Sequence, residues 1–229
     1  MNIVFSMNWI LASIQIKLDS LFEYAELIEK LIEKEFKKFN LKVEKEAAKL
    51  SDEQKDGLYD YYSDEHWNFS KGYSDILRTS LFIKCYSLLE YELDALCKHL
   101  CEKNNYSLIL TDLNGKGIFR AKDYLKKVAL INFPDSTNEW QEVTAYNKIR
   151  NIFVHNAGTF DNEESLNKLA YIFNTHTSIK SDKLLQIHLE KEFCFEVITV
   201  LKQFFDKLFK TIPVEFLKKN NLLDKIELN

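Results

Sequence analysis

The chain has 229 residues, a formal net charge of −4 and a sequence pI near 5.8. Hydrophobic residues make up 46% and charged residues 29%, which is the balance of a globular protein able to bury a sizeable core in a single domain, 1–229. The acidic balance excludes a broad, sequence-independent grip on nucleic acid, because that needs an excess of lysine and arginine on one face. A small local RNA site remains compatible with it.

Tight turns are scarce, since the chain contains only 5 glycines and 2 prolines. This favours long helices over many short strands. No internal repeat, low-complexity tract or long linker divides the chain. We therefore predict an all-α fold, a helical bundle with long antiparallel helices.

The N-terminal residues 1–16 carry no charge. They lack the basic start and the small-residue cleavage site of a signal peptide, and they are shorter than the roughly 20 apolar residues that span a bilayer. We interpret them as the buried start of the first helix. We predict no membrane partner and a cytoplasmic location.

A long amphipathic helix is predicted from about Asn8 toward Leu50, because apolar residues recur at steps of three and four. Charged residues between them are predicted to form a solvated face. The apolar set is Ile14, Leu18, Leu21, Ala25, Ile28, Ile32, Phe36 and Phe39. The charged set is Glu26, Glu29, Lys30, Glu33, Lys34 and Lys37.

Ser51 and Gln54 fit a capping box that opens a short helix. The following segment, Leu58–Phe69, is dense in aromatic and acidic residues and is predicted to be a loop. Its rings either stack on bases or cover the helical core, and we favour the core because aromatic side chains mostly serve packing. The adjacent residues 64–66 point in different directions, which argues against a metal site.

A strongly apolar helix is predicted from Ser74 to about Leu100, with Glu90 and Asp94 as acids within it. A loop follows, from Asn104 to Gly117.

Phe119–Ala129 is predicted to be a short helix with a local basic cluster, formed by Arg120, Lys122, Lys126 and Lys127. These side chains either attract a phosphate backbone or form an ordinary solvated face, and we favour the solvated face.

The next helix is predicted over residues 139–158. Asp135 and Ser136 offer a start signal after Pro134, and Gly158 suits the left-handed turn at the end.

The C-terminal part is predicted to contain a short helix capped by Asp161 or Asn162 and ending near Phe173. A turn over Ser178–Asp182 and an extended piece over Leu184–Leu189 follow. Residues 190–210 form an amphipathic helix that ends before Pro213, and a short terminal helix comes after it.

The four cysteines are Cys85, Cys97, Cys101 and Cys194. Cys97 and Cys101 share a helix face, but His99 lies on the opposite side, so these three cannot bind one metal from a continuous helix. We interpret the cysteines as small buried hydrophobes in a reducing cytoplasm, and we predict neither a metal nor a cofactor.

The helix over 139–158 carries a polar face. At about 100° per residue, Asn147, Asn151 and His155 follow one another along it, with Arg150 on its flank. Apolar residues lie within this face, which indicates burial against another surface, such as a second copy of the helix. These are Trp140, Val143 and Val154.

Arg150 and His155 are the candidate reactive pair. On a regular helix they are separated by about 140° and 7.5 Å, so they reach one another only if the arginine swings or if both border one cleft. A guanidinium suits phosphate and an imidazole transfers protons near neutral pH, which together suit phosphodiester chemistry. In the structural alternative, Arg150 pairs with an acid and His155 lies at the negative end of the helix dipole.

The stretch Arg150-Asn151-Ile152-Phe153-Val154-His155 resembles the R-x4-H signature of the HEPN superfamily, including the polar residue after the arginine. The continuation into Asn156-Ala157-Gly158 is also similar to many members. The resemblance covers most of the chain in helical pattern but only this stretch in residue identity. The frequent His-x-Tyr ending is absent, because Ala157 follows Asn156, and this puts regulation by tyrosine modification in doubt.

The resemblance implies a HEPN-like, metal-independent endoribonuclease of a toxin–antitoxin or antiviral defence module. It implies a homodimer in which two R-x4-H motifs meet, with RNA as substrate and an antitoxin of the nucleotidyltransferase type as a further partner. Arg150 and His155 would be catalytic, with Asn151 and Asn147 in support. Glu90 either orients Arg150 or is a plain surface glutamate.

A second reading stays open beside this one. It is a catalytically inactive HEPN-like module that binds a protein partner or a nucleotide.

Overall fold

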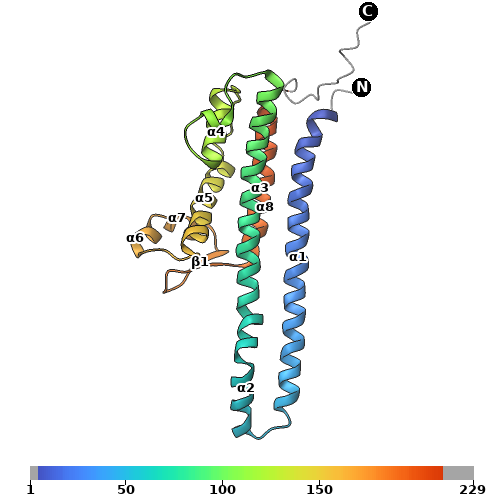
Figure 1. Ribbon diagram of the computed structural model, residues 1–229. Helices are drawn as coiled ribbons and strands as arrows, with labels where there is room; N and C mark the ends of the chain where they lie inside the picture. The colour runs from blue at the N-terminus through green and yellow to red at the C-terminus, as the bar shows by residue number, and fades with distance from the viewer. Residues whose placement is uncertain (1–4, 214–229) are drawn as a thin grey trace, which may run out of the picture. The chain divides into compact units, whose positions relative to one another are not determined.

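The computed structural model describes residues 5–213, and helices dominate this part of the chain (Figure 1). The predicted all-α helical bundle is confirmed as a fold class. The elements, in chain order, are α1 (Phe5–Ala47), α2 (Asp52–Trp67), the π-helical turn η1 (Asn68–Gly72), α3 (Tyr73–Asn104), the 3-10 turn η2 (Leu110–Asp112), α4 (Gly117–Lys127), α5 (Asn138–Asn156), α6 (Glu163–Asn167), α7 (Ala170–Thr175), β1 (Ile179–Ser181), β2 (Ile187–Leu189) and α8 (Lys191–Thr211).

The chain divides into two compact units, and α1, α3, α5 and α8 each contribute residues to both. Within the described residues, unit 1 comprises 5–19, 85–147 and 199–213, and unit 2 comprises 20–84 and 148–198. The organisation as a single domain stays a prediction. Each unit is described below by itself.

Unit 1 has an aromatic core around Trp140. The Trp140 ring meets Phe133 edge-to-face with centroids 4.8 Å apart, and it lies 5.6 Å from the ring of Phe204 in α8. Tyr124 of α4 is fully buried and donates a hydrogen bond from its hydroxyl to the carbonyl of Leu108 at 2.8 Å. Such rings account for much of the apolar surface that a small core removes from water.

Unit 2 corrects the prediction of a loop over Leu58–Phe69. This segment is helical, because α2 runs to Trp67 and passes through η1 directly into α3. Leu58, Tyr62 and Phe69 fall at helical spacing, and they pack against Phe39 and Val43 of α1. The rings thus contribute to the core of unit 2, which is the interpretation favoured from the sequence, but they do so from a helix and not from a loop.

A second correction concerns the predicted turn over Ser178–Asp182. Ile179–Ser181 forms β1, which pairs antiparallel with β2 so that Ile179 faces Leu189. The turn instead lies between β1 and β2, over residues 182–186. There the Asp182 carboxylate accepts hydrogen bonds from the backbone amides of Leu184 and Gln186 at 2.8 and 3.0 Å. The extended piece predicted over Leu184–Leu189 is confirmed only for Ile187–Leu189, which forms β2, while Leu184 and Leu185 belong to the turn.

The remaining predicted helices are confirmed with shifts of a few residues at their ends. The capping box at Ser51 is present, with the Ser51 amide donating to the Gln54 side chain at 3.1 Å. The short helix predicted to end near Phe173 is split into α6 and α7, and Asn162 caps α6. The terminal helix predicted after Pro213 lies outside the described residues.

Two predictions about α1 need correction. Trp9 is exposed although the start of the helix was expected to be buried, while Ile14 is buried as expected. Glu29, predicted to be solvated, is buried and paired with an arginine of α3. No helix within residues 5–213 has both the length and the apolar character needed to cross a membrane.

Candidate functional site

The candidate site is built on the C-terminal half of α5. The helix begins after Thr137, whose carbonyl accepts a hydrogen bond from the Gln141 amide at 3.2 Å. Thr137 therefore takes the place predicted for Asp135 or Ser136 at the helix start. Asp135 instead accepts ion pairs from Lys126 at 2.6 Å and Lys122 at 3.3 Å.

The end of α5 is fixed by its own turn and by the β-hairpin of unit 2. Gly158 has φ +83° and donates its amide to the carbonyl of Ile152 at 3.1 Å, which closes the helix in the left-handed conformation. The Gly158 carbonyl accepts a hydrogen bond from the Ile187 amide at 2.8 Å, and Thr159 forms a bridge with Gln186. The turn that carries His155 is thus anchored to β2.

Arg150 and His155 lie in this anchored half of α5, in unit 2. Arg150 is half-buried, and its guanidinium Nη1 donates to the Asn151 side-chain oxygen at 3.0 Å. His155 is exposed. The next residue, Asn156, donates from its side chain to Asp161 at 2.8 Å. This arrangement orients a cation beside a helix turn that presents an accessible imidazole.

Asn147 and Glu90, the two other predicted site residues, belong to unit 1. The Asn147 side chain donates to the hydroxyl of Tyr86 at 2.6 Å, so Asn147 of α5 forms a structural contact with α3. A Cβ added at Gly117 would lie 2.8 Å from the Glu90 carboxylate, which places Glu90 at the start of α4. That Glu90 orients Arg150 stays a prediction.

The three lysines of the basic cluster of α4 form ion pairs with neighbouring acids within unit 1. Lys122 and Lys126 share Asp135, and Lys127 pairs with Asp123 at 2.8 Å. The hydrogen bond from Lys126 is the largest of the effects that lower the pKa of Asp135. These pairs support the solvated-face interpretation of the cluster.

Two of the buried cysteine thiols have little nucleophilic character. Cys85, Cys97 and Cys194 are buried as predicted, whereas Cys101 is partly exposed. Burial raises the pKa of both Cys97 and Cys194 to about 12, so these thiols stay protonated near neutral pH. Within residues 5–213, no group of three or more His, Cys, Asp or Glu side chains is arranged to hold a metal ion.

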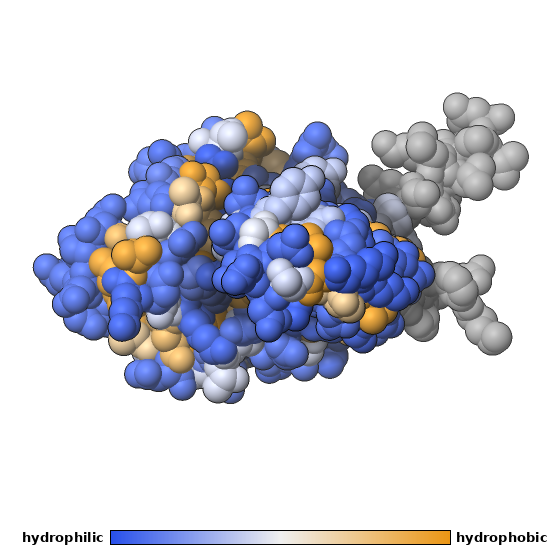
Figure 2. Space-filling model, turned by 90° about the horizontal axis from the view of Figure 1, so that it is seen from below, coloured by the Kyte–Doolittle hydropathy of each residue, from blue (hydrophilic) through white to orange (hydrophobic). Residues whose placement is uncertain are grey.

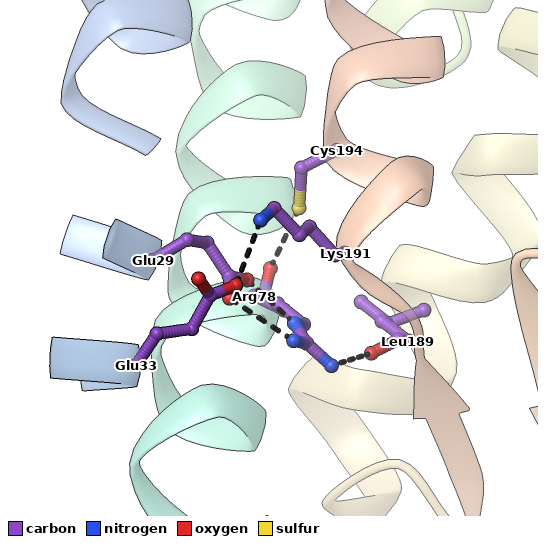
Figure 3. Close-up of polar contacts among 6 residues, drawn as sticks. All are labelled: Glu29, Glu33, Arg78, Leu189, Lys191 and Cys194. Carbon is purple, nitrogen blue, oxygen red and sulfur yellow. Dashed lines mark hydrogen bonds and ion pairs between the residues drawn. The ribbon is translucent and has the colours of Figure 1, made fainter. Parts of the chain in front are cut away.

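Sequence reasoning missed a charge network in unit 2, buried at Glu29 and exposed at Glu33 (Figure 3). The Arg78 guanidinium donates to both carboxylate oxygens of Glu29, at 2.7 and 3.1 Å, and to the carbonyl of Leu189 at 3.1 Å. Cys194 donates its thiol to the Arg78 carbonyl at 3.4 Å, and Lys191 donates to Glu33 at 3.0 Å. The available signal was an acid, Glu29, at a core-facing position of α1, which needs a partner cation.

A second missed cluster surrounds His188 on β2. Its Nε2 lies 2.9 Å from Asp182, and its Nδ1 lies 3.8 Å from Asp75 of α3. The hydrogen bond with His188 is the largest of the effects that lower the pKa of Asp182. The three side chains border a polar hollow of ≈ 380 Å³ in unit 2.

A larger groove of ≈ 640 Å³ lies between α1 and α2 in unit 2, lined in part by Tyr59, Tyr62, His66 and Trp67. Seen from below, where the chain passes from α1 to α2, the surface is mostly hydrophilic with scattered hydrophobic patches (Figure 2). Arg150 and His155 line neither this groove nor the polar hollow beside His188.

Comparison with known proteins adds no family assignment. No protein-family model, curated protein or solved structure matches the chain. The likeness to HEPN proteins therefore rests on the R-x4-H stretch of α5 within an all-α fold, and it stays a prediction.

Proposed function

We propose that this chain is a metal-independent endoribonuclease whose reactive groups are Arg150 and His155, completed by the same groups of a second copy. One observation carries the proposal. The same anchored helix holds Arg150, which is half-buried and oriented by Asn151, and His155, which is exposed five residues later. The spacing is that of the R-x4-H signature. The net charge of −4 agrees with a small local RNA contact.

The chemistry requires a base, an acid and positive charge on one phosphate. His155 of one copy takes the proton from the ribose 2′-hydroxyl, and the 2′-oxygen attacks the neighbouring phosphorus. The bond from phosphorus to the 5′-oxygen breaks, and His155 of the other copy gives that oxygen a proton. Arg150 stabilises the pentacovalent phosphate, while Asn151 holds the guanidinium. The products are a 2′,3′-cyclic phosphate and a 5′-hydroxyl.

The reaction is tested by incubating the full chain with end-labelled RNA of mixed sequence in EDTA. Cleavage is expected, together with a cyclic phosphate in the product mass spectrum. His155→Ala and Arg150→Ala are each expected to lower the rate by about 10²–10⁴-fold. His66→Ala is the matched control, because His66 is also an exposed histidine of unit 2. RNA with a 2′-deoxyribose at the cut site should stay intact.

Absence of cleavage by the folded wild-type protein, or equal cleavage by His155→Ala, would contradict the proposal. Those outcomes would leave the second reading, a non-catalytic helical module. A toxin or defence role adds one further expectation. Expression of the wild-type chain should slow the growth of a bacterial host, and Arg150→Ala should relieve the effect.

A further inference from the structure

Within unit 2, helix α1 carries a second apolar face that points away from its buried side. Tyr24, Leu27 and Leu31 are 51%, 64% and 48% exposed. Their spacing of three and four residues places them on one stripe of the helix, called here the outer α1 face. Ala25 and Glu29, by contrast, are buried. A stripe of large apolar side chains in water indicates an interaction surface.

The charges at the two ends of the outer α1 face have opposite sign. Glu23 precedes Tyr24, whereas Lys34 and Lys38 follow Leu31, and all three charged residues are exposed. Lys38 also pairs with Glu35 at 2.7 Å. Because Glu35 offsets the charge of Lys38, the face runs from Glu23, through three apolar side chains, to an end whose net positive charge comes from Lys34.

We propose that the outer α1 face binds the same face of a second copy in antiparallel orientation. A twofold axis midway between Leu27 and Leu31 packs Leu27 of each copy against Leu31 of the other. The same axis places Tyr24 and Glu23 of each copy beside Lys34 of the other, which combines a cation–π contact with an ion pair. A parallel arrangement would instead place Glu23 beside Glu23 and Lys34 beside Lys34, so charge selects the antiparallel dimer.

This inference goes beyond the proposed function and does not depend on it. The outer α1 face lies on α1, whereas Arg150 and His155 lie on α5, so each interface can be changed without touching the residues of the other. A contact built on three apolar side chains per copy belongs to the small, transient class of interfaces. We therefore expect a concentration-dependent dimer and not a permanent one.

The test uses two single charge reversals and their mixture. Glu23→Lys and Lys34→Glu should each weaken self-association about tenfold or more, because the twofold axis places two like-charge contacts in every dimer. An equimolar mixture of the two variants restores opposite charges at both ends. Native mass spectrometry of the mixture should then show heterodimers above the statistical proportion, and sedimentation velocity should show regained dimer.

Matched controls separate this interface from general surface effects. Lys84→Glu makes the same charge change as Lys34→Glu at another exposed position of unit 2, on α3, and should leave the association unchanged. Leu27→Asp should abolish the association through the outer α1 face and leave only what the interface around α5 supports, while Ile76→Asp, at an exposed apolar residue of α3, should not weaken the association. Circular dichroism melting curves should match the wild type for all these variants, because each side chain is exposed.

Three results would overturn the proposal. The first is a wild-type protein that sediments as a monomer up to millimolar concentration. The second is a dimer that both single reversals leave unchanged. The third is a statistical distribution of species in the mixture, which would mean that the dimer forms through another surface, such as the one proposed around α5.

Discussion

Each unit buries one glutamate of a helix beside a cation, but the two pairs are built differently. In unit 2, Glu29 receives two hydrogen bonds from Arg78, whose side chain is 17% exposed. In unit 1, Glu92 receives one contact of 2.6 Å from Lys17, whose side chain is 46% exposed. Both carboxylates are buried.

The difference shows what an arginine fork contributes in place of a point charge. Besides holding Glu29 of α1, the Arg78 guanidinium binds a carbonyl of β2, and the Arg78 carbonyl accepts the Cys194 thiol of α8. Burial lowers the pKa of Arg78, but the hydrogen bond and charge of Glu29, together with the charges of Glu190 and Asp75, outweigh it and raise that pKa. Lys17 can exchange its carboxylate for water. Unit 2 should therefore depend on its charge pair more than unit 1 does.

The largest expected effect comes from removing the cation in each unit. Arg78→Met leaves Glu29 buried without its hydrogen-bonded cation and should lower the free energy of unfolding by about 3–5 kcal/mol. Lys17→Met should lower it by about 1 kcal/mol, since solvent already screens the lysine. Urea denaturation followed by circular dichroism measures both values.

A double substitution is the control for that prediction. Replacing the pair by Glu29→Leu with Arg78→Met removes both charges and should recover most of the stability lost in Arg78→Met. Equal losses for Arg78→Met and Lys17→Met would show that the fork gives unit 2 no advantage over the point charge in unit 1.

The second prediction compares one glycine from each unit. Gly158 has φ +83°, and an added Cβ would lie 2.8 and 2.9 Å from ring atoms of Phe153, a ring that itself meets Phe82 at 6.0 Å. Gly117 has φ +52°, and its Cβ would meet only the flexible end of Glu90. Gly158→Ala should therefore cost about 3 kcal/mol and Gly117→Ala about 1 kcal/mol.

Thermal and urea unfolding of the two alanine variants measure this contrast. Phe153→Leu combined with Gly158→Ala should recover part of the loss, because it removes the ring that resists the new methyl group. If both alanine variants lost the same stability, backbone conformation alone would govern both sites and the Phe153 ring would have no role.

Much of the fold was predictable because helices are encoded locally. The steps of three and four residues that define α1 and α8, and the capping box at Ser51, are properties of neighbouring residues. The error over residues 58–69 came from weighing aromatic and acidic composition above spacing, since Leu58, Tyr62 and Phe69 already repeat with the helical period. The β1–β2 pairing could not be predicted in the same way, because it joins Ile179 to Leu189, ten residues away, across the turn at Asp182.

The candidate site was predictable only in part, for a related reason. The positions of Arg150, Asn151 and His155 on one helix follow from the sequence, and so does the glycine that ends it. The partners of buried polar groups do not follow. Glu29 finds Arg78 across 49 residues of chain, and Asn147 finds Tyr86 across 61. An acid on an apolar stripe indicates that a cation exists, but the tertiary fold selects which one.

The smallest expected effect concerns one acid in each unit whose pKa is shifted in opposite directions. Burial raises the pKa of Asp94 in unit 1, and the charge of Arg120 counteracts this only in part. In unit 2, the hydrogen bond from Lys191 lowers the pKa of Glu33. Ionised Asp94 therefore favours the unfolded chain, whereas ionised Glu33 favours the folded one.

Asp94→Asn should accordingly raise the free energy of unfolding near neutral pH, by less than about 1 kcal/mol because solvent screens this side chain. Its gain over the wild type should shrink as the pH falls toward about 4, where the unfolded chain also protonates Asp94. Glu33→Gln should show a loss near neutral pH that vanishes over a similar acidic range, since the glutamate contributes only while it is ionised. Urea unfolding between pH 3 and pH 7 measures both differences. A gain for Glu33→Gln or a loss for Asp94→Asn would each remove the contrast, and both together would mean that the carboxylate of unit 1 is the better compensated of the two.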